Sequence, residues 1–319
     1  MIRPLKLPGD FRVGVDLILH GFQNERVDKK EVAVDSLRSL RYLWPLIRIG
    51  SLFSPGLRDY YRGYIWEEDS RPVGLVVFGR VDKERWEIDI IVVLPEFRRR
   101  GIARSLMQAA IGFIRKQGGK VAFLDADGSS EAAGILYQQI GFEQVFTSIE
   151  YNQEKDLTQS WPLPDGYEFL ILKPSDWRTQ YDIEWRVTPE RVTRYEPVVE
   201  SRYRAPGAVR FFQFLLWKFS GQKVSQIAVR SSNGKIVAWG RYLARMRPGG
   251  VNYASLRIDP KHESLAICLE SHLIKLIQQI SPGRRIMFSV PDWQESLIQA
   301  SLTIGSTERS RYHRMGLFL

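Results

Sequence analysis

The stretch Val93-Leu94-Pro95-Glu96-Phe97-Arg98-Arg99-Arg100-Gly101-Ile102-Ala103-Arg104 decides which fold we predict for the first half of this chain. A strand-like apolar run over 88–93 precedes it, and a helix-like apolar run over 102–114 follows it. Pro95 ends the strand because proline cannot donate to a sheet ladder, and Gly101 lets a ligand approach the backbone. The unpaired amides of a first helical turn bind anions. The stretch therefore predicts a phosphate site.

The elements around this stretch form one alternating series. Three strand patterns joined by short polar turns precede it, which favours an antiparallel meander. The predicted elements of the first half are a strand over 1–7, a helix over 11–22, strands over 61–67, 73–81 and 86–93, a helix over 102–116, a strand over 121–124, a helix over 131–139 and a strand over 144–151.

The composition limits the classes of protein to consider. With 319 residues, 44% hydrophobic and 26% charged, the chain is typical of globular protein in one large or two ordinary domains. The net charge of +10 indicates anionic partners or serves only solubility. A single cysteine, Cys268, excludes an intrachain disulfide and a cysteine zinc cluster. Without a signal-peptide pattern or a long apolar run, we predict a cytoplasmic protein with no membrane span. Because His262 and His272 flank a helix without a metal-like set of carboxylates, we predict no metal.

Two motifs resemble the signatures of the GCN5-related N-acetyltransferases (GNAT family). Arg98-x-x-Gly101-x-Ala103 resembles the first, and Ala133-x-x-Leu136-Tyr137-x-x-x-Gly141-Phe142 resembles the second. The resemblance covers roughly residues 1–151. It implies a mixed, mostly antiparallel sheet flanked by helices, in the α+β or α/β class. It also implies transfer of an acetyl group from acetyl-CoA to an amine acceptor. Because the only thiol lies far from the motifs, we expect direct attack in a ternary complex.

The resemblance also implies which residues hold the coenzyme. Backbone groups at the end of the strand would pair with the pantetheine arm as an added strand does. The amides of the turn would cradle the pyrophosphate, with charge-assisted help from arginines. The alternative for the arginines is a solvated basic turn. The coenzyme-binding residues so implied are Ile91, Val92, Val93, Arg98, Arg99, Arg100, Gly101, Ile102, Ala103 and Arg104.

Three residues are candidates for catalysis. Tyr137 matches the tyrosine that protonates the departing thiolate in many members, and its alternative is a core aromatic. Glu87 stands where the family's protein-lysine acetyltransferases carry a general base. Asp89, two residues on, would share its strand face. The alternative for both carboxylates is a salt bridge to a neighbouring strand, for example with Arg80.

The second half repeats the first after a linker over 152–166. Val93-Leu94-Pro95 returns as Ile258-Asp259-Pro260, and Gly118 matches Gly283 at the same offset. We therefore predict a catalytic domain over 1–151 and a degenerate copy over 167–319, in a monomeric pseudo-dimer or a homodimer. The copy would have lost coenzyme binding, since the predicted counterparts of Arg98, Gly101 and Tyr137 are Glu263, Ala266 and Leu302.

An alternative function is a non-catalytic binding protein on the same scaffold, which senses coenzyme A or associates with nucleic acid. Segments over 32–61 and 193–219, which mix arginine with aromatic residues, motivate it. No nucleic-acid motif is visible beyond charge, so we do not expect nucleic acid as a partner. The acceptor stays open, with a slight preference for acceptors that carry negative charge, because of these arginines.

Overall fold

The computed structural model describes residues 1–22, 61–173, 175–204, 221–247 and 250–319. Of the two arginine–aromatic segments, 32–60 and 205–219 lie outside the described residues. The chain divides into two compact units. The first unit contains Met1–Ala126, Ser130–Gln144 and Arg314–Leu319, and the second contains Asp127–Ser129 and Val145–His313.

The first unit is a mixed sheet with helices. Its strand order is β1-β2-β3-β4-β5-β12, in which β1 to β4 are antiparallel and β5 runs parallel to β4. Its elements are β1 (Ile2–Pro4), α1 (Phe11–Gly21), β2 (Arg62–Glu68), β3 (Arg71–Arg80), β4 (Arg85–Val93), the 3-10 helix η1 (Pro95–Phe97), α4 (Ile102–Lys116), β5 (Val121–Asp127), α5 (Glu131–Ile140) and the end of β12 (Thr307–Phe318).

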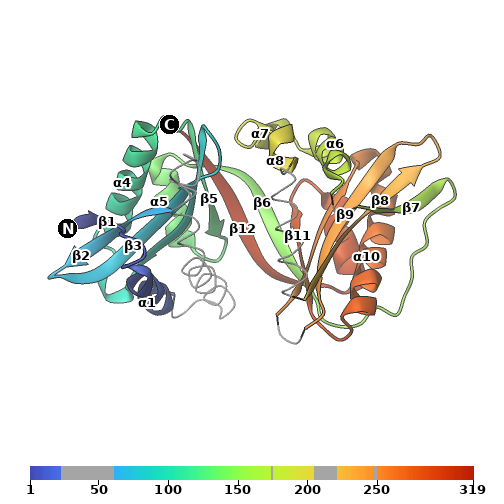
Figure 1. Ribbon diagram of the computed structural model, residues 1–319, viewed down its shortest axis with the longest axis horizontal. Helices are drawn as coiled ribbons and strands as arrows, with labels where there is room; N and C mark the ends of the chain where they lie inside the picture. The colour runs from blue at the N-terminus through green and yellow to red at the C-terminus, as the bar shows by residue number, and fades with distance from the viewer. Residues whose placement is uncertain (23–60, 174, 205–220, 248–249) are drawn as a thin grey trace. The chain divides into compact units, whose positions relative to one another are not determined.

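Helices α1 and α4 cover opposite faces of this sheet (Figure 1). A Cβ on Gly74 of β3 would lie 3.1 Å from Ile102 of α4, so α4 packs closely on that face. A Cβ on Gly21 of α1 would collide with Val92, whose cross-strand partner is the residue after Gly74. Successive strand residues face opposite sides, so Val92 and α1 lie on the other face.

From β7 to α11 the second unit follows the element order that the described part of the first unit shows from β1 to α5, with the short helices α7 and α8 in addition. Its strand order is β12-β6-β11-β10-β9-β8-β7, with β10 and β11 parallel as β4 and β5 are. The predicted tandem arrangement of two mixed, mostly antiparallel sheets is confirmed. Its elements are β6 (Glu143–Gln153), β7 (Tyr167–Leu172), α6 (Trp177–Val187), α7 (Glu190–Thr193), α8 (Glu200–Tyr203), β8 (Gln222–Ser231), β9 (Ile236–Arg245), β10 (Asn252–Ile258), the 3-10 helix η2 (Pro260–Leu265), α10 (Ala266–Ile280), β11 (Ile286–Pro291), α11 (Glu295–Ile304) and β12.

The units depart from a simple division of the chain between residues 151 and 167. Most of β6 belongs to the second unit, where it pairs with β11 from Ser148↔Pro291 to Gln153↔Ile286. The end of β12 belongs to the first unit, where Met315 is 2% exposed within the core. An alternating strand pattern predicts which residues face the core and leaves the pairing partner unspecified. A boundary at 151 follows from the order of the elements along the chain, whereas the two compact units also depend on which strands pair.

Candidate active site

The turn before α4 has the geometry of an anion site. Gly101 is the N-cap of α4 with φ of 77°, and a Cβ there would meet nothing within 4 Å. The first helical bond runs from Ser105 N to Gly101 O at 3.0 Å, and the first turn holds no acidic residue. The amides of residues 102–104 are therefore those that α4 cannot satisfy itself. Glycine fits here because other residues rarely adopt this φ.

The four predicted arginines have different surroundings. Arg98 is turned inward, where its Nε donates to Val93 O at 3.1 Å and its Nη2 donates to Gly21 O. Arg100 pairs with Glu68 at 3.3 Å, and Arg104 donates to Gln139. Arg99, at φ 64°, makes no hydrogen bond or ion pair in the described part of the chain. Arg98 thus fixes the turn to β4 and α1, and Arg99 is the one of these four arginines without such a contact within the described ranges.

Three residues at the end of β4 are predicted to bind the pantetheine arm, and their backbone groups point to different sides of the strand. Leu94 N donates to Val73 O of β3 at 2.9 Å. Since alternate residues direct their backbone groups to opposite sides, Val92 also faces β3, and Ile91 and Val93 face the side of β5. Strand β4 pairs with β5 from Arg85 to Glu87. The backbone groups of Ile91 and the N–H of Val93, whose carbonyl oxygen already accepts from Arg98, are therefore on the side that suits an added ligand strand, and those of Val92 are not.

A β-bulge sets the position of Asp89. Val77 pairs with Ile90 and Phe78 pairs with Ile88, so Asp89 is the additional residue on β4. Bulges re-aim side chains and interrupt the alternation on which the shared face of Glu87 and Asp89 was predicted. The two carboxylates nevertheless interact, since Glu87 raises the pKa of Asp89.

The ion pair of Glu87 comes from an unexpected strand. Arg314 on β12 donates from Nη1 to Glu87 Oε1 at 2.7 Å and lies 3.1 Å from Asp125 Oδ2 on β5. Its guanidinium carbon is 4.1 Å from the centroid of the Phe123 ring. Arg80, the partner suggested from sequence, instead lies over the Trp86 ring at 4.7 Å. No local sequence pattern marks Arg314, which is 227 residues from Glu87.

The carboxyl group of Asp89 has a raised pKa. Its side chain reaches solvent, yet burial by the surrounding protein is the largest cause that raises its pKa to about 7. The charges of Glu87 and Asp125 raise the pKa further, and Arg314 lowers it. A carboxylate with a pKa near 7 is suited to general base catalysis at neutral pH.

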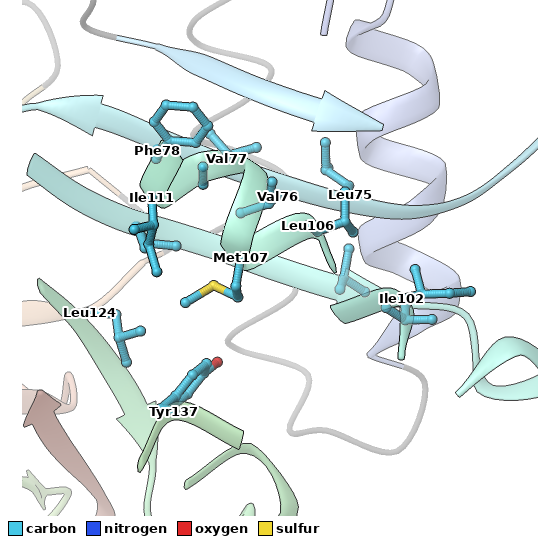
Figure 2. Packing of buried hydrophobic residues seen from close by; sticks show 14 of the residues in the cluster. Leu75, Val76, Val77, Phe78, Ile102, Leu106, Met107, Ile111, Leu124 and Tyr137 are labelled. Carbon is cyan, nitrogen blue, oxygen red and sulfur yellow. The ribbon is translucent and has the colours of Figure 1, made fainter. Parts of the chain in front are cut away.

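Tyr137 lies at the edge of the core of the first unit. It is 6% exposed, and its ring centroid lies 6.2 Å from that of Phe142. Figure 2 shows the ring extending from α5 near Leu124 and Met107, with the hydroxyl at the end away from α5. The residue is thus both a core aromatic and a phenol directed out of its helix.

In the described part of the second unit, the corresponding places are built differently. Its turn is the 3-10 helix η2, and the N-cap of α10 is Leu265, not a left-handed glycine. Since α5 begins at Glu131 and α11 at Glu295, the counterpart of Tyr137 is Ser301 rather than the predicted Leu302. By the same comparison of helix starts, Leu265 replaces the predicted Ala266 as counterpart of Gly101.

Gln294 fills the strand end of the second unit. Its carboxamide accepts from Ile258 N at 2.8 Å and donates to Ile258 O at 3.1 Å, and the side chain is buried. Ile258 ends β10 as Val93 ends β4, and Asp259 N donates to β9, so Ile258 faces away from β9. The backbone groups that would receive an added strand here are therefore already bound. At the matching N-cap of α5 stands the smaller Ser130.

Two further searches cover the described ranges only. There, no cluster of histidine, cysteine, aspartate and glutamate side chains is arranged to hold a metal ion. None of the helices in those ranges has both the length and the apolar character that crossing a membrane requires.

Comparison with known proteins identifies the family of the first half. Residues 31–142 match the Acetyltransferase (GNAT) family. An uncharacterized N-acetyltransferase of Methanocaldococcus jannaschii is 30% identical over 110 residues, which are 33% of this chain and 44% of that protein. The ribosomal protein bS18-alanine N-acetyltransferase of Escherichia coli is 29% identical over 82 residues, or 26% of this chain and 49% of that protein. The matches thus span less than half of these relatives.

Solved structures share the fold of the whole chain. A tandem GNAT protein from the clavulanic acid biosynthesis pathway has a TM-score of 0.64 at 16% identity and covers 100% of this chain and 98% of its own. A GCN5-related N-acetyltransferase from Sphaerobacter thermophilus has a TM-score of 0.65 at 15% identity and covers 99% of this chain and 95% of its own. The first half of the chain therefore carries a match to the GNAT family, and the chain as a whole has the fold of a tandem GNAT protein.

Proposed function

We propose that the protein is an N-acetyltransferase that moves an acetyl group from acetyl-CoA to an amine acceptor in its first unit. The observation that carries this proposal is the left-handed Gly101 turn, which presents the unpaired amides of α4 beside the open side of β4. Anion-binding amides next to unpaired strand groups suit a ligand that joins a pyrophosphate to an amide-containing arm.

Most of the predicted coenzyme residues have a role in this proposal. Acetyl-CoA, as cosubstrate, supplies the activated acetyl group. The amides of residues 102–104 and the side chain of Arg99 bind the pyrophosphate, and the backbone groups of Ile91 and the N–H of Val93 pair with the pantetheine arm. Arg98 acts indirectly, because it holds the turn against Val93 and Gly21.

Proton transfer is assigned to Asp89 and Tyr137. An amine acceptor arrives protonated, and Asp89 takes one proton from it so that the nitrogen lone pair can attack the thioester carbonyl. The C–N bond forms and the C–S bond breaks. Tyr137 gives its hydroxyl proton to the departing thiolate and regains a proton from the acetylated nitrogen. Asp89 then releases its proton to solvent, which balances the reaction. Asp89 suits the base role better than Glu87, which is ion-paired with Arg314.

The proposed function includes no preference for negatively charged acceptors. The arginines that motivated it lie mostly outside the described residues. Near the proposed base stand Glu87 and Asp125, whose charges disfavour an anionic acceptor.

We further propose that only the first unit binds the coenzyme. In the second unit Gln294 occupies the backbone groups of Ile258, and η2 replaces the glycine turn. Titration calorimetry with acetyl-CoA should therefore give one site per chain. A ratio of two would contradict this assignment.

The test of the function compares two glycines of α4. Gly101 and Gly118 flank the helix with φ of 77° and 75°, and a Cβ at either meets nothing within 4 Å. Gly101→Glu and Gly118→Glu therefore carry the same backbone strain and the same charge. In a thermal-shift titration, acetyl-CoA should stabilise the wild type and Gly118→Glu, but not Gly101→Glu, because a carboxylate at the turn repels phosphate. Equal responses of the two variants would sink the proposal.

Turnover separates the enzyme from the coenzyme-sensing alternative. Acetyl-CoA labelled in the acetyl group is incubated with fractionated amine extracts, and the label should appear in an amine product. Binding of the coenzyme without any transfer across the fractions would favour the sensing protein instead.

A further inference from the structure

Arg314 is an arginine that the end of the chain supplies to the candidate site of the first unit. It lies on β12, in the second half of the sequence, and the part of β12 from Arg314 onward belongs to the first unit. Its side chain is 9% exposed and contacts Glu87, Asp125 and the face of Phe123. Two carboxylates and one aromatic ring on two strands therefore fix the guanidinium.

These contacts divide the three acidic residues into two kinds. Glu87 and Asp125 share the positive charge of Arg314, and each lies within 3.1 Å of it. Asp89 makes no hydrogen bond or ion pair within the described ranges. A buried guanidinium holds carboxylates in place through charge-assisted contacts. Glu87 and Asp125 are thus committed to a partner, and Asp89 remains available for a proton.

A purely structural ion pair would look similar, and the same strand provides one for comparison. Arg309 on β12 is also 9% exposed in its side chain and pairs with Glu150 at 3.3 Å in the second unit. It has no part in the candidate site. Arg309 is therefore a matched control for the burial, charge and strand position of Arg314.

We propose that Arg314 is a positioning residue for acetyl transfer, which holds Glu87 and Asp125 as paired carboxylates so that Asp89 alone accepts the proton of the amine. This inference rests on the proposed function of the first unit. It makes the end of the chain part of the active site in the first half, although the residue itself touches neither substrate.

The charged groups around Asp89 define what removal of Arg314 does. Glu87 lies on the same strand, Asp125 on β5 and Arg314 on β12. Arg314 lowers the pKa of Asp89, and the two carboxylates raise it. In Arg314→Gln the opposing charge is lost and both carboxylates stay, so the pKa of Asp89 rises. In Arg314→Lys the charge stays and the planar fork is lost, so the rise is smaller.

The experiment is a 13C NMR titration of protein labelled at the aspartate carboxyl carbons, with Asp89→Asn used to assign the Asp89 signal. We expect the midpoint of Asp89 to rise by about one pH unit in Arg314→Gln, by less in Arg314→Lys and not at all in Arg309→Gln. An unchanged midpoint in Arg314→Gln, or an equal change in Arg309→Gln, would overturn the proposal.

Two additions keep the test decisive. If Arg314→Gln does not fold, the triple variant Glu87→Gln/Asp125→Asn/Arg314→Gln removes the two carboxylates that loss of Arg314 leaves unpaired. The titration midpoint of Asp89 in this triple variant should fall below that of the wild type. The reason is that both repelling carboxylates are gone while the burial of Asp89 remains. A midpoint equal to that of the wild type would overturn the proposal.

Thermal-shift titration with acetyl-CoA on Arg314→Lys should match the wild type. If acetyl-CoA does not stabilise even the wild type, that result counts against the proposed function rather than against the role of Arg314.

Discussion

Asp89 is the residue whose ionisation should govern the pH dependence of transfer. Its pKa is raised to about 7, chiefly by burial, and a base works only when deprotonated. The value of kcat/KM should therefore rise with pH and level off above about 7. Asp89→Asn should lose this acid limb together with ~10²-fold or more of kcat. A limb that persists in Asp89→Asn would remove Asp89 from the mechanism.

Glu87 provides the contrast to this prediction. Its charge raises the pKa of Asp89, and its carboxylate also engages Arg314. In Glu87→Gln the repulsion is lost and Arg314 is less neutralised, so the acid limb should move to lower pH with activity retained. If Glu87 were itself the base, the variant would instead be inactive over the whole pH range.

Tyr137 combines a packing role with the proposed acid role, and Tyr137→Phe separates the two. The ring and its contact with Phe142 stay, so the free energy of unfolding should change by no more than about 1 kcal/mol. Loss of the proton donor should lower kcat by about 10²-fold, with acetyl-CoA affinity nearly unchanged. Calorimetry and initial rates measure the two effects. An unchanged kcat would leave Tyr137 a core aromatic only.

At the scale of the element, Gln294 should stabilise the second unit by binding a strand end. It satisfies both N–H and C=O of Ile258 in a buried place, and an unsatisfied buried group costs about 1–3 kcal/mol. Gln294→Leu should lower the free energy of unfolding by roughly 2 kcal/mol or more in urea titrations. Gln299 on the same helix is exposed, so Gln299→Leu should change it by less than about 0.5 kcal/mol. Equal effects would contradict the role of Gln294.

The elements around the glycine turn were predictable because their causes are local. Pro95, Gly101 and the apolar spacing of 102–114 each act within a few residues, and the predicted helix over 102–116 matches α4. The bulge at Asp89 was not predictable, since it exists only in the pairing of β4 with β3. Counterparts in the second unit are shifted by one residue at both α10 and α11 for a similar reason: an offset taken from the strands does not locate an insertion or a deletion.

At the scale of the whole molecule, stability should depend on pH through Glu270 of the second unit. Burial raises its pKa to about 8, and Ser301 donates to one of its oxygens at 3.2 Å. The folded state keeps the proton that the unfolded state loses near pH 4.5, so this contribution is present below pH 4.5 and is lost as pH rises to 8. Glu270→Gln should be more stable than the wild type at pH 8, by up to ~4 kcal/mol, and similar at pH 4. A pH-independent difference would contradict this assignment.

Substitutions in residues 314–319 should lower the stability of the first unit, to which these residues belong, although they lie in the second half of the sequence. Met315 is 2% exposed in the core of the first unit, and Leu317 and Leu319 pack against that core. Met315→Ala should therefore destabilise the first unit by roughly 2–4 kcal/mol, whereas Met246→Ala, at a methionine that is 57% exposed, should have little effect. Hydrogen exchange identifies which unit loosens. Faster exchange should appear in β4 and β5, beside the site that holds Arg314, because the core that Met315 joins includes Val92 and Leu124. Loosening confined to residues 145–313 would show that the end of β12 belongs with the second half after all.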